Sequence, residues 1–157
     1  MGLSCKIILA RHNLSLDLAF KTESKGITAI YGPSGTGKTT ILKIIAGIER
    51  GDKGSSISLD NTVWQNDATF TPTHQRKLAY VFQQPRLFPH LTAGGNLEFA
   101  YSRRRNSRGI SISDAISQFG LSDFIDQFPD QLSGGQAQRV AIARALVSAP
   151  DMLLMDE

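Results

Sequence analysis

The segment that most constrains this chain is the glycine-rich stretch Gly32-Pro33-Ser34-Gly35-Thr36-Gly37-Lys38-Thr39. Its spacing is that of a phosphate-binding loop, or P-loop. The apolar run Ile27 to Tyr31 precedes it and predicts a buried strand, and the pattern from Thr39 to Gly47 predicts an amphipathic helix that stops at Gly47. A strand, a glycine-rich turn and a helix in this order indicate an α/β fold with a site for a nucleoside triphosphate.

The residue types in this loop explain the chemistry. Gly32, Gly35 and Gly37 let the backbone turn its N–H groups inward, where they and the positive end of the helix can hold phosphate oxygens. We expect Lys38 to reach the β- and γ-phosphates and the Thr39 hydroxyl to bind Mg²⁺. The other members of the predicted nucleotide site are Pro33, Ser34, Thr36 and Thr40. The alternative, a turn that binds nothing, does not explain why strand, helix, lysine and hydroxyl are all in register.

A second candidate element of the site lies at the end of the sequence. The apolar run Met152 to Met155 predicts a buried strand, and Asp156 and Glu157 follow it directly. Sheets of α/β proteins place ligand chemistry at the carboxyl ends of their strands. We therefore expect Asp156 to hold Mg²⁺ and Glu157 to polarise the water that attacks the γ-phosphate, although such a pair can also be an ordinary strand end.

Apolar periodicity and turn residues predict the remaining elements. The predicted strands are Cys5 to Leu9, Leu14 to Phe20, Ser56 to Leu59 and Lys77 to Phe82, and the predicted helices are Thr92 to Tyr101, Ser111 to Phe119, Ser122 to Phe128 and Gly135 to Ser148. A small β layer thus precedes the core, and helices dominate from Thr92 onward.

The composition is that of a globular domain of 157 residues with a net charge of +3. No apolar run is long enough to span a bilayer, and the N-terminus lacks the apolar segment of a signal peptide, so we expect a cytoplasmic location. Arg103, Arg104, Arg105 and Arg108 make the basic balance local, and we interpret this run as a solvated helix end or loop. Cys5 lies in an apolar run, which favours a buried thiol.

The motif Leu132-Ser133-Gly134-Gly135-Gln136 opens a predicted helix and could form a second phosphate cradle by the same dipole effect. With this motif, its continuation from Gln138 to Leu146 and the strand that ends in Asp156-Glu157, the sequence resembles the ABC ATPase family. The resemblance extends from about Gly26 to Glu157. The run Arg86 to Thr92 is similar to importer ATPases. The runs Gly26 to Tyr31 and Gly94 to Leu97 together look most like the ATP-binding subunits of molybdate importers.

This resemblance implies roles and partners. Gln83 would contact Mg²⁺ and the attacking water, which makes Lys38, Gln83 and Glu157 the expected catalytic residues and Thr39, Gln83 and Asp156 the expected metal ligands. Two ATP-binding subunits would pack head to tail, with Ser133, Gly134, Gly135 and Gln136 of one facing the ATP bound by the other. Integral-membrane permease subunits and a substrate-binding protein would be separate chains, on the cytoplasmic face of the inner membrane, and no nucleic acid partner is expected.

We therefore expect one α/β domain over residues 1–157, with a P-loop core at 1–83 and 136–157, an antiparallel β layer and a helical subdomain at 84–135. The family pattern continues past Glu157 with a further strand and a switch histidine, so we expect an incomplete domain. The turn Arg11-His12-Asn13 has no aromatic residue where family members commonly stack adenine. Two alternatives are a nucleotide-binding fragment without hydrolysis and a soluble ABC ATPase of nucleic-acid metabolism.

Overall fold

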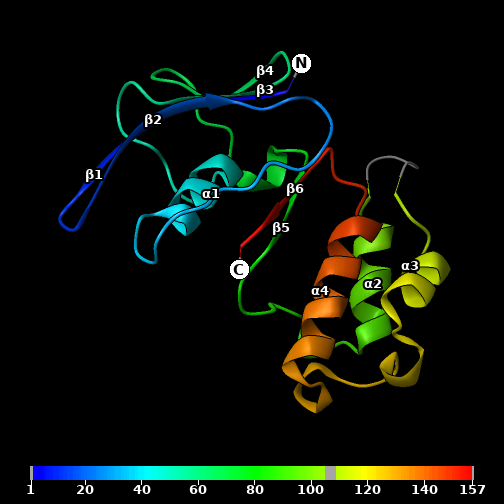
Figure 1. Cartoon of the computed structure of the whole chain (residues 1–157). Helices are drawn as coiled ribbons and strands as arrows, with labels where there is room; N and C mark the ends of the chain where they lie inside the picture. Colours follow the sequence, from blue (N-terminus) through cyan, green and yellow to red (C-terminus); the bar gives the residue numbers. More distant parts are fainter. Residues whose placement is uncertain (1, 105–108, 157) are drawn as a thin grey trace. The chain divides into compact units, whose positions relative to one another are not determined.

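The computed structural model describes residues 2–104 and 109–156. The chain divides into two compact units, Met1–Arg76 and Lys77–Glu157 (Figure 1). Glu157 and residues 105–108, which include part of the basic run, lie outside the described residues.

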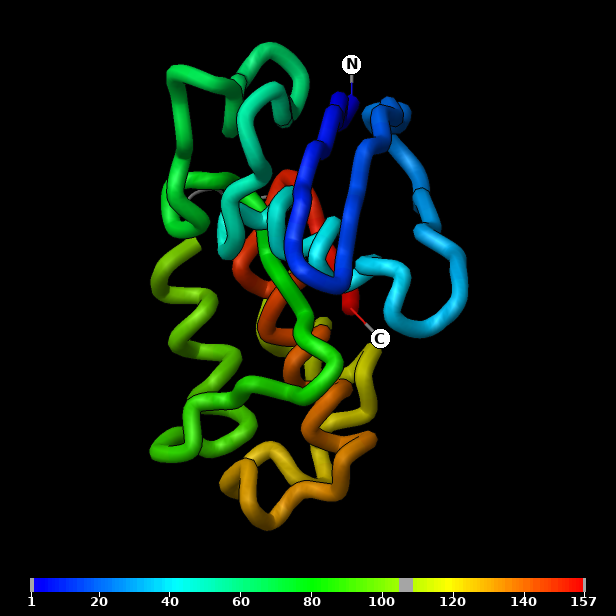
Figure 2. Tube along the Cα trace, turned by 90° about the vertical axis from the view of Figure 1, so that its left-hand side faces the viewer, coloured from blue at the N-terminus to red at the C-terminus, as the bar shows by residue number. Residues whose placement is uncertain are grey.

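The first unit contains a four-stranded antiparallel sheet in the order β2-β1-β3-β4. Its strands are β1 (Leu3–Arg11), β2 (Leu14–Lys21), β3 (Ser56–Leu59) and β4 (Thr62–Gln65). Every second residue of β1 from Leu3 to Leu9 is buried, because successive side chains of a strand point to opposite faces. This sheet confirms the predicted β layer, and Figure 2 follows the β1–β2 hairpin into the connection that leads to the first helix.

Helix α1 (Lys38–Ala46) packs against β1 and buries Ile41, Ile44 and Ile45. It begins after Gly37 and ends at Gly47, whose φ of 74° closes the helix with backbone hydrogen bonds to Ile44 and Lys43. The helix predicted from Thr39 to Gly47 is therefore confirmed to within one residue at each end.

The strand predicted at Ile27 to Tyr31 is wrong in this structure. The segment connects β2 to α1 without regular structure (Figure 1). The side chains of Ile27 and Tyr31 are 100% exposed. An extended segment becomes a strand only when a neighbouring strand accepts and donates its backbone hydrogen bonds. Neither of the sheets found in the described residues provides that neighbour, so the apolar pattern alone does not produce a strand.

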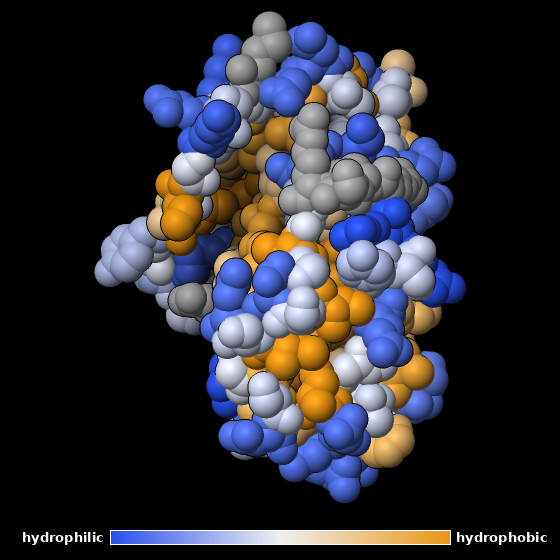
Figure 3. All heavy atoms as spheres, turned by 90° about the vertical axis from the view of Figure 1, so that its right-hand side faces the viewer, coloured by the Kyte–Doolittle hydropathy of each residue, from blue (hydrophilic) through white to orange (hydrophobic). Residues whose placement is uncertain are grey.

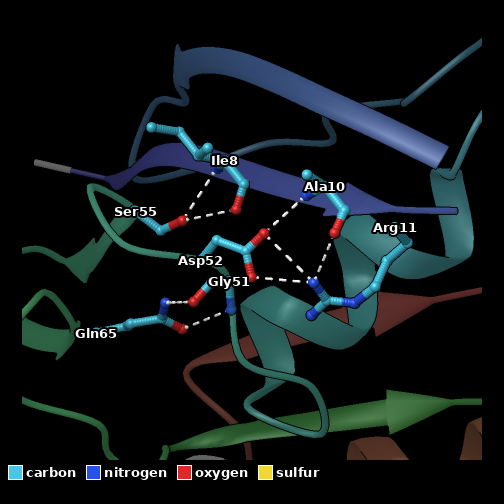
Figure 4. Close-up of polar contacts among 7 residues, drawn as sticks. All are labelled: Ile8, Ala10, Arg11, Gly51, Asp52, Ser55 and Gln65. Atoms are coloured by element: carbon cyan, nitrogen blue, oxygen red, sulfur yellow. Dashed lines mark hydrogen bonds and ion pairs between the residues drawn. The ribbon is translucent and has the colours of Figure 1, made fainter.

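The loop between α1 and β3 is tied to β1 by side chains (Figure 4). Asp52 accepts hydrogen bonds from the Ala10 N–H at 2.7 Å and from Arg11 Nη1 at 3.0 Å, and these bonds lower the pKa of Asp52. The Ser55 hydroxyl bonds both backbone groups of Ile8, at 3.0 Å each. The buried Gln65 amide likewise bonds the N–H and C=O of Gly51. These bonds fix the turn that follows α1.

The second unit combines a two-stranded parallel sheet with helices. Strand β5 (Leu78–Val81) pairs with β6 (Met152–Met155), with Val81 opposite Met155. The helices are α2 (Ala93–Ser102), α3 (Ile112–Phe119) and α4 (Gly134–Val147). The strands and these three helices confirm the predicted elements. Thr92 and Ser111 accept backbone hydrogen bonds at the starts of α2 and α3, as their positions predict.

The helices share one apolar core around buried Leu97, Leu121 and Phe124. Part of this unit's apolar surface is exposed, and Figure 3, viewed from the side of α3, shows apolar side chains there. The residues that pack against the core but are only partly buried include Ile112, Ile116, Phe119 and Ile125. Among the described residues, each helix is too short or too polar to span a bilayer.

The helix predicted from Ser122 to Phe128 is wrong, because only a 3₁₀ turn forms there, at Ser122–Phe124. The next carbonyls are used elsewhere. The carbonyl of Ile125 accepts the N–H of Gly94 at 2.7 Å, and the carbonyl of Gln127 accepts the N–H of Ala93 at 2.8 Å. These bonds satisfy N–H groups in the first turn of α2. The carbonyls of Ile125 and Gln127 are therefore occupied, and the 3₁₀ turn at Ser122–Phe124 does not continue as an α-helix.

Candidate functional site

The glycine-rich loop of the first unit turns through two left-handed residues, Gly35 with φ 82° and Gly37 with φ 92°. The residue that caps the start of α1 is Gly37, which has no side chain to accept the first-turn N–H groups. A Cβ at Gly37 would lie 3.0 Å from Leu14 Cδ1, which shows that the loop packs closely on the start of β2. The combination of left-handed glycines and a helix start is the geometry expected of a phosphate-binding loop.

The predicted phosphate-binding lysine lies over this loop. Lys38 Nζ donates to the Gly32 carbonyl at 2.8 Å and to the Pro33 carbonyl at 2.7 Å. The Thr36 hydroxyl donates to the same Pro33 carbonyl at 2.9 Å. The Lys38 ammonium is thus held beside the α1 N-terminus by backbone acceptors that an anion can replace. Ser34 is exposed, and Thr39 and Thr40 lie partly buried in the first turn of α1.

In the second unit, two predicted site residues follow neighbouring strands. Gln83 lies in an exposed bend just after β5, and Asp156 directly follows β6. Since β5 and β6 are parallel and adjacent, both residues lie at the carboxyl-end edge of this sheet. The Asp156 N–H bonds the Val81 carbonyl at 2.9 Å, and Asp156 is only 7% exposed. The predicted catalytic Glu157 lies outside the described residues.

Tyr80 contacts the candidate metal ligand and was missed by sequence reasoning. Its hydroxyl donates to Asp156 Oδ2 at 3.0 Å. Carboxylates that bind metals are commonly oriented by such outer hydrogen bonds. The only sequence signal is that Tyr80 precedes Gln83 in a strand that neighbours the acidic strand end.

The predicted metal ligands supply a hydroxyl, an amide oxygen and a carboxylate, from Thr39, Gln83 and Asp156. Oxygen ligands with few carboxylates suit Mg²⁺, which keeps several waters and binds phosphate oxygens. In the parts of the chain that the structure describes, no three His, Cys, Asp or Glu side chains gather into a metal-binding group. The predicted set does not require such a group.

The motif at Leu132 to Gln136 forms the exposed start of α4. Ser133 caps the helix by accepting the Gln136 N–H at 3.3 Å, and Gln136 Oε1 accepts the Ser133 N–H at 2.7 Å. A Cβ added to Gly134 or Gly135 would meet no described atom within 4 Å, so the surface above both glycines is open. The structure therefore presents an accessible, well-capped helix N-terminus here.

A buried polar network links the segment after Gln83 to α2 and α4. Asn96 in α2 is fully buried; its Oδ1 accepts the Phe88 N–H at 2.9 Å and Arg144 Nη1 at 3.2 Å. Arg144 in α4 also donates to the Arg86 carbonyl at 2.7 Å, and burial lowers its pKa. Sequence reasoning missed this network, and the only available signal was an asparagine beside Leu97 on the core side of α2.

The two remaining sequence interpretations concern Cys5 and the basic run. Cys5 is 3% exposed, and burial raises the pKa of its thiol to about 12, so the predicted buried thiol is confirmed. In the described part of the basic run, Arg103 lies over the Phe99 ring and Arg104 over the Tyr101 ring, at 3.9 and 3.8 Å from the ring centroids. These arginines therefore pack on aromatic faces of α2.

Comparison with known proteins gives a consistent result. Residues 16–157 match the domain family described as "ABC transporter". The chain is 48% identical over 142 residues to the molybdenum import ATP-binding protein ModC of Methylococcus capsulatus, covering 90% of this chain and 40% of that protein. It is 47% identical to the protein of the same name from Thiobacillus denitrificans, covering 91% of this chain and 40% of that protein. The chain thus spans about two fifths of the length of these relatives.

Solved structures agree. A dimeric ATP-binding cassette in a post-hydrolysis state, bound to ADP and Pi, matches with a TM-score of 0.79 and 29% identity, over 99% of this chain and 73% of that one. The ATP-binding subunit of an ABC transporter matches with a TM-score of 0.77 and 25% identity, over 100% and 66% of the two chains. These matches confirm the predicted α/β fold of the P-loop ABC ATPase type.

Proposed function

Because the chain belongs to the ABC transporter family, we propose that it is part of an ATP-binding subunit that hydrolyses ATP to drive import of a small anion, molybdate. The observation that carries the ATP site is the loop from Gly32 to Lys38, whose left-handed glycines place its backbone and the Lys38 ammonium at the start of α1. The names of the relatives support molybdate as the transported anion.

Each site residue has a role in this proposal. The loop N–H groups and Lys38 bind the β- and γ-phosphates, with Lys38 exchanging the Gly32 and Pro33 carbonyls for phosphate oxygens. Thr39, Gln83 and Asp156 would hold Mg²⁺ through oxygen ligands, and the ion would supply positive charge to the phosphates. Glu157 orients and polarises the attacking water. Tyr80 holds the Asp156 carboxylate in place through its hydrogen bond.

The open start of α4 supports a second subunit as the partner. Ser133, Gly134, Gly135 and Gln136 are accessible, and a helix N-terminus attracts phosphate. In a head-to-tail dimer, this turn would face the γ-phosphate bound by Lys38 of the second subunit. Permease subunits and a substrate-binding protein complete the proposed importer, with this subunit on the cytoplasmic face of the membrane.

The exposed segment before the P-loop favours a second candidate function for this chain, nucleotide binding without hydrolysis. Ile27 and Tyr31 are fully exposed in a segment without regular structure. A loop that follows an unanchored segment can still bind phosphate, because Gly32 to Lys38 and α1 are contiguous in sequence. Alignment of a water for in-line attack requires tighter positioning than binding does.

The first test is Lys38→Ala, which removes the ammonium but keeps the glycine turn. We expect the affinity for MgATP to fall at least tenfold, since a charge-assisted contact to phosphate contributes about 1.5 to 3 kcal/mol. Equilibrium titration by calorimetry measures it. Lys43→Ala is the matched control, because Lys43 lies on the same helix and pairs with Glu49 at 3.6 Å instead. Equal affinities for the Lys38→Ala variant and the unsubstituted chain would exclude the P-loop as the site.

The transported anion needs a separate test. Deleting the gene should lower cellular molybdenum when external molybdate is scarce, and excess molybdate should restore it. Unchanged molybdenum content after deletion, measured by mass spectrometry of washed cells, would contradict molybdate as the cargo.

A further inference from the structure

Arg76 is a deeply buried cation that lies outside the predicted nucleotide site. It closes the first unit just after the 3₁₀ turn Thr73–Gln75 and is 3% exposed. Within the described residues it makes no ion pair with a carboxylate. The charge of the Cys5 thiol would interact with Arg76, but burial raises the pKa of Cys5 to about 12, so the thiol is neutral at pH 7. Burying an unpaired charge is costly unless its hydrogen bonds are satisfied.

Backbone carbonyls satisfy this guanidinium. Nη1 donates to the carbonyls of Ile44 at 3.0 Å and Ile45 at 2.5 Å, which belong to the last turn of α1. Nη2 donates to the Trp64 carbonyl at 3.3 Å, and Nε donates to the Thr71 carbonyl at 2.8 Å. Arg76 therefore ties the C-terminal end of the phosphate-loop helix to β4 and to the segment after it.

The side chains and backbone around Arg76 fit a guanidinium closely. Its Cζ lies 5.4 Å from the ring centroids of both Trp64 and Phe70, the distance of a cation–π contact. A Cβ at Gly47 would come within 2.6 Å of Arg76 Cζ, so only glycine leaves room for the side chain at the end of α1. The negative end of the helix dipole adds to the attraction. Burial lowers the pKa of Arg76 to about 10, which leaves it charged at neutral pH.

Helix α1 connects the surroundings of Arg76 to the predicted nucleotide site. The helix has nine residues and is about 13 Å long, with Lys38 at its start and the carbonyls bound by Arg76 at its end. A helix of this length moves as a rigid body, so a tilt at one end displaces the other. The position of Lys38 and the first-turn N–H groups therefore depends on how firmly the last turn is held.

We propose that Arg76 is a positioning residue of the nucleotide site: it holds the last turn of α1 and thereby fixes the phosphate-binding end, and it couples this helix to Trp64. The inference rests on the proposed function, because it assigns Arg76 to the ATP site at the opposite end of the helix. Arg76 does not touch the nucleotide. It acts through α1.

The coupling to Trp64 provides a readout that a purely structural role would not change. Trp64 is the only tryptophan in the sequence and is 3% exposed. The Arg76 guanidinium carbon lies 5.4 Å from the indole ring centroid, so we expect Trp64 emission to depend on where the guanidinium lies. If phosphate binding at the start of α1 displaces the helix, the guanidinium bonded to its last turn is displaced as well, and Trp64 emission should change saturably as MgATP is added.

The experiment compares three variants of the 157-residue chain by titration with MgATP, following Trp64 emission and, separately, heat of binding. Arg76→Met keeps the volume but removes every donor, and we expect about tenfold weaker binding and loss of the emission change. Arg76→Lys keeps the charge but loses the planar guanidinium, so its affinity for MgATP should lie between those of Arg76→Met and the unsubstituted chain. Arg50→Met is the matched control. Arg50 also lies 5.4 Å from the Phe70 ring centroid, whereas the carbonyls of Ile44 and Ile45 in α1 accept hydrogen bonds from Arg76. Its affinity and emission change should match those of the unsubstituted chain.

The outcomes separate the inference from the proposed function. Unchanged affinity and unchanged Trp64 response in Arg76→Met and Arg76→Lys would overturn the positioning role, while ATP binding would stand. If Arg76→Met does not fold, Arg76→Lys decides, and wild-type behaviour of that variant overturns the role. If the unsubstituted chain does not bind MgATP, or Lys38→Ala binds it equally well, the proposed function fails and the inference fails with it.

Discussion

Gly35 and Gly37 share a left-handed backbone but differ in their surroundings, and this difference can be tested at the scale of single residues. A Cβ at Gly35 meets open space, whereas a Cβ at Gly37 lies 3.0 Å from Leu14 and 3.2 Å from Leu16. The left-handed backbone costs an L-residue about 1 to 2 kcal/mol at either position. Only Gly37→Ala also requires neighbouring side chains, those of Leu14 and Leu16 in β2, to give way. The close contact therefore makes Gly37 the more demanding of the two positions.

We accordingly expect Gly37→Ala to lower the unfolding free energy of the first unit by more than Gly35→Ala does. Urea unfolding followed by Trp64 emission measures both variants, because Trp64 lies in this unit. Gly35→Ala is the internal control for backbone strain alone. Equal losses for the two variants would mean that the packing of Leu14 on the loop contributes nothing.

At the scale of elements, Asn96 holds the segment before α2 to α2 and α4. Asn96→Leu keeps the approximate volume but leaves the Phe88 N–H and Arg144 without their shared acceptor. A buried donor without a partner costs about 1 to 3 kcal/mol, so the second unit should unfold at lower urea concentration. Far-UV circular dichroism measures this unfolding, because α2, α3 and α4 lie in that unit.

The control for that substitution is Gln118→Leu, which replaces an exposed amide on α3. It should change the free energy of unfolding by no more than about 0.5 kcal/mol, the range of ordinary surface substitutions. An Asn96→Leu chain that unfolds like Gln118→Leu would show that the network adds no stability to the helices.

At the scale of the whole molecule, the residues needed for binding and for hydrolysis differ in how far apart they lie in sequence. The P-loop and α1 belong to one compact unit, and Gln83 and Asp156 belong to the other. We expect the 157-residue chain to bind MgATP but to release phosphate no faster than its Lys38→Ala variant, and to be only marginally stable. Exposed apolar residues such as Ile27 and Tyr31 contribute no buried surface to the small margin of about 5 to 15 kcal/mol that holds a domain folded.

Phosphate release at saturating MgATP, with Lys38→Ala as the blank, measures the first part of this expectation, and calorimetric melting measures the second. Turnover well above the blank, with a single sharp melting transition in the absence of nucleotide, would contradict it. Binding without turnover would favour the second candidate function.

The sequence by itself determined the features that depend on neighbours only a few positions away. The glycine turn before α1 and the limits of α1 were predictable, as were the caps of α2 and α3 by Thr92 and Ser111 and the start of α4 to within one residue of the predicted Gly135. Each relies on local hydrogen bonds or backbone angles. The roles assigned to the site residues remain predictions, since no ligand tests them.

Only the tertiary structure decided the features that need a partner far along the chain. Ile27 to Tyr31 has the apolar pattern of a strand but finds no neighbour among the described residues to complete its hydrogen bonds, and Ile125 and Gln127 give their carbonyls to α2 instead of continuing a helix. The contact of Arg76 with α1 is not encoded locally, because its acceptors in that helix lie more than thirty residues earlier. Hydrogen bonds within one turn are encoded locally, whereas the satisfaction of distant backbone groups depends on which elements the fold brings together.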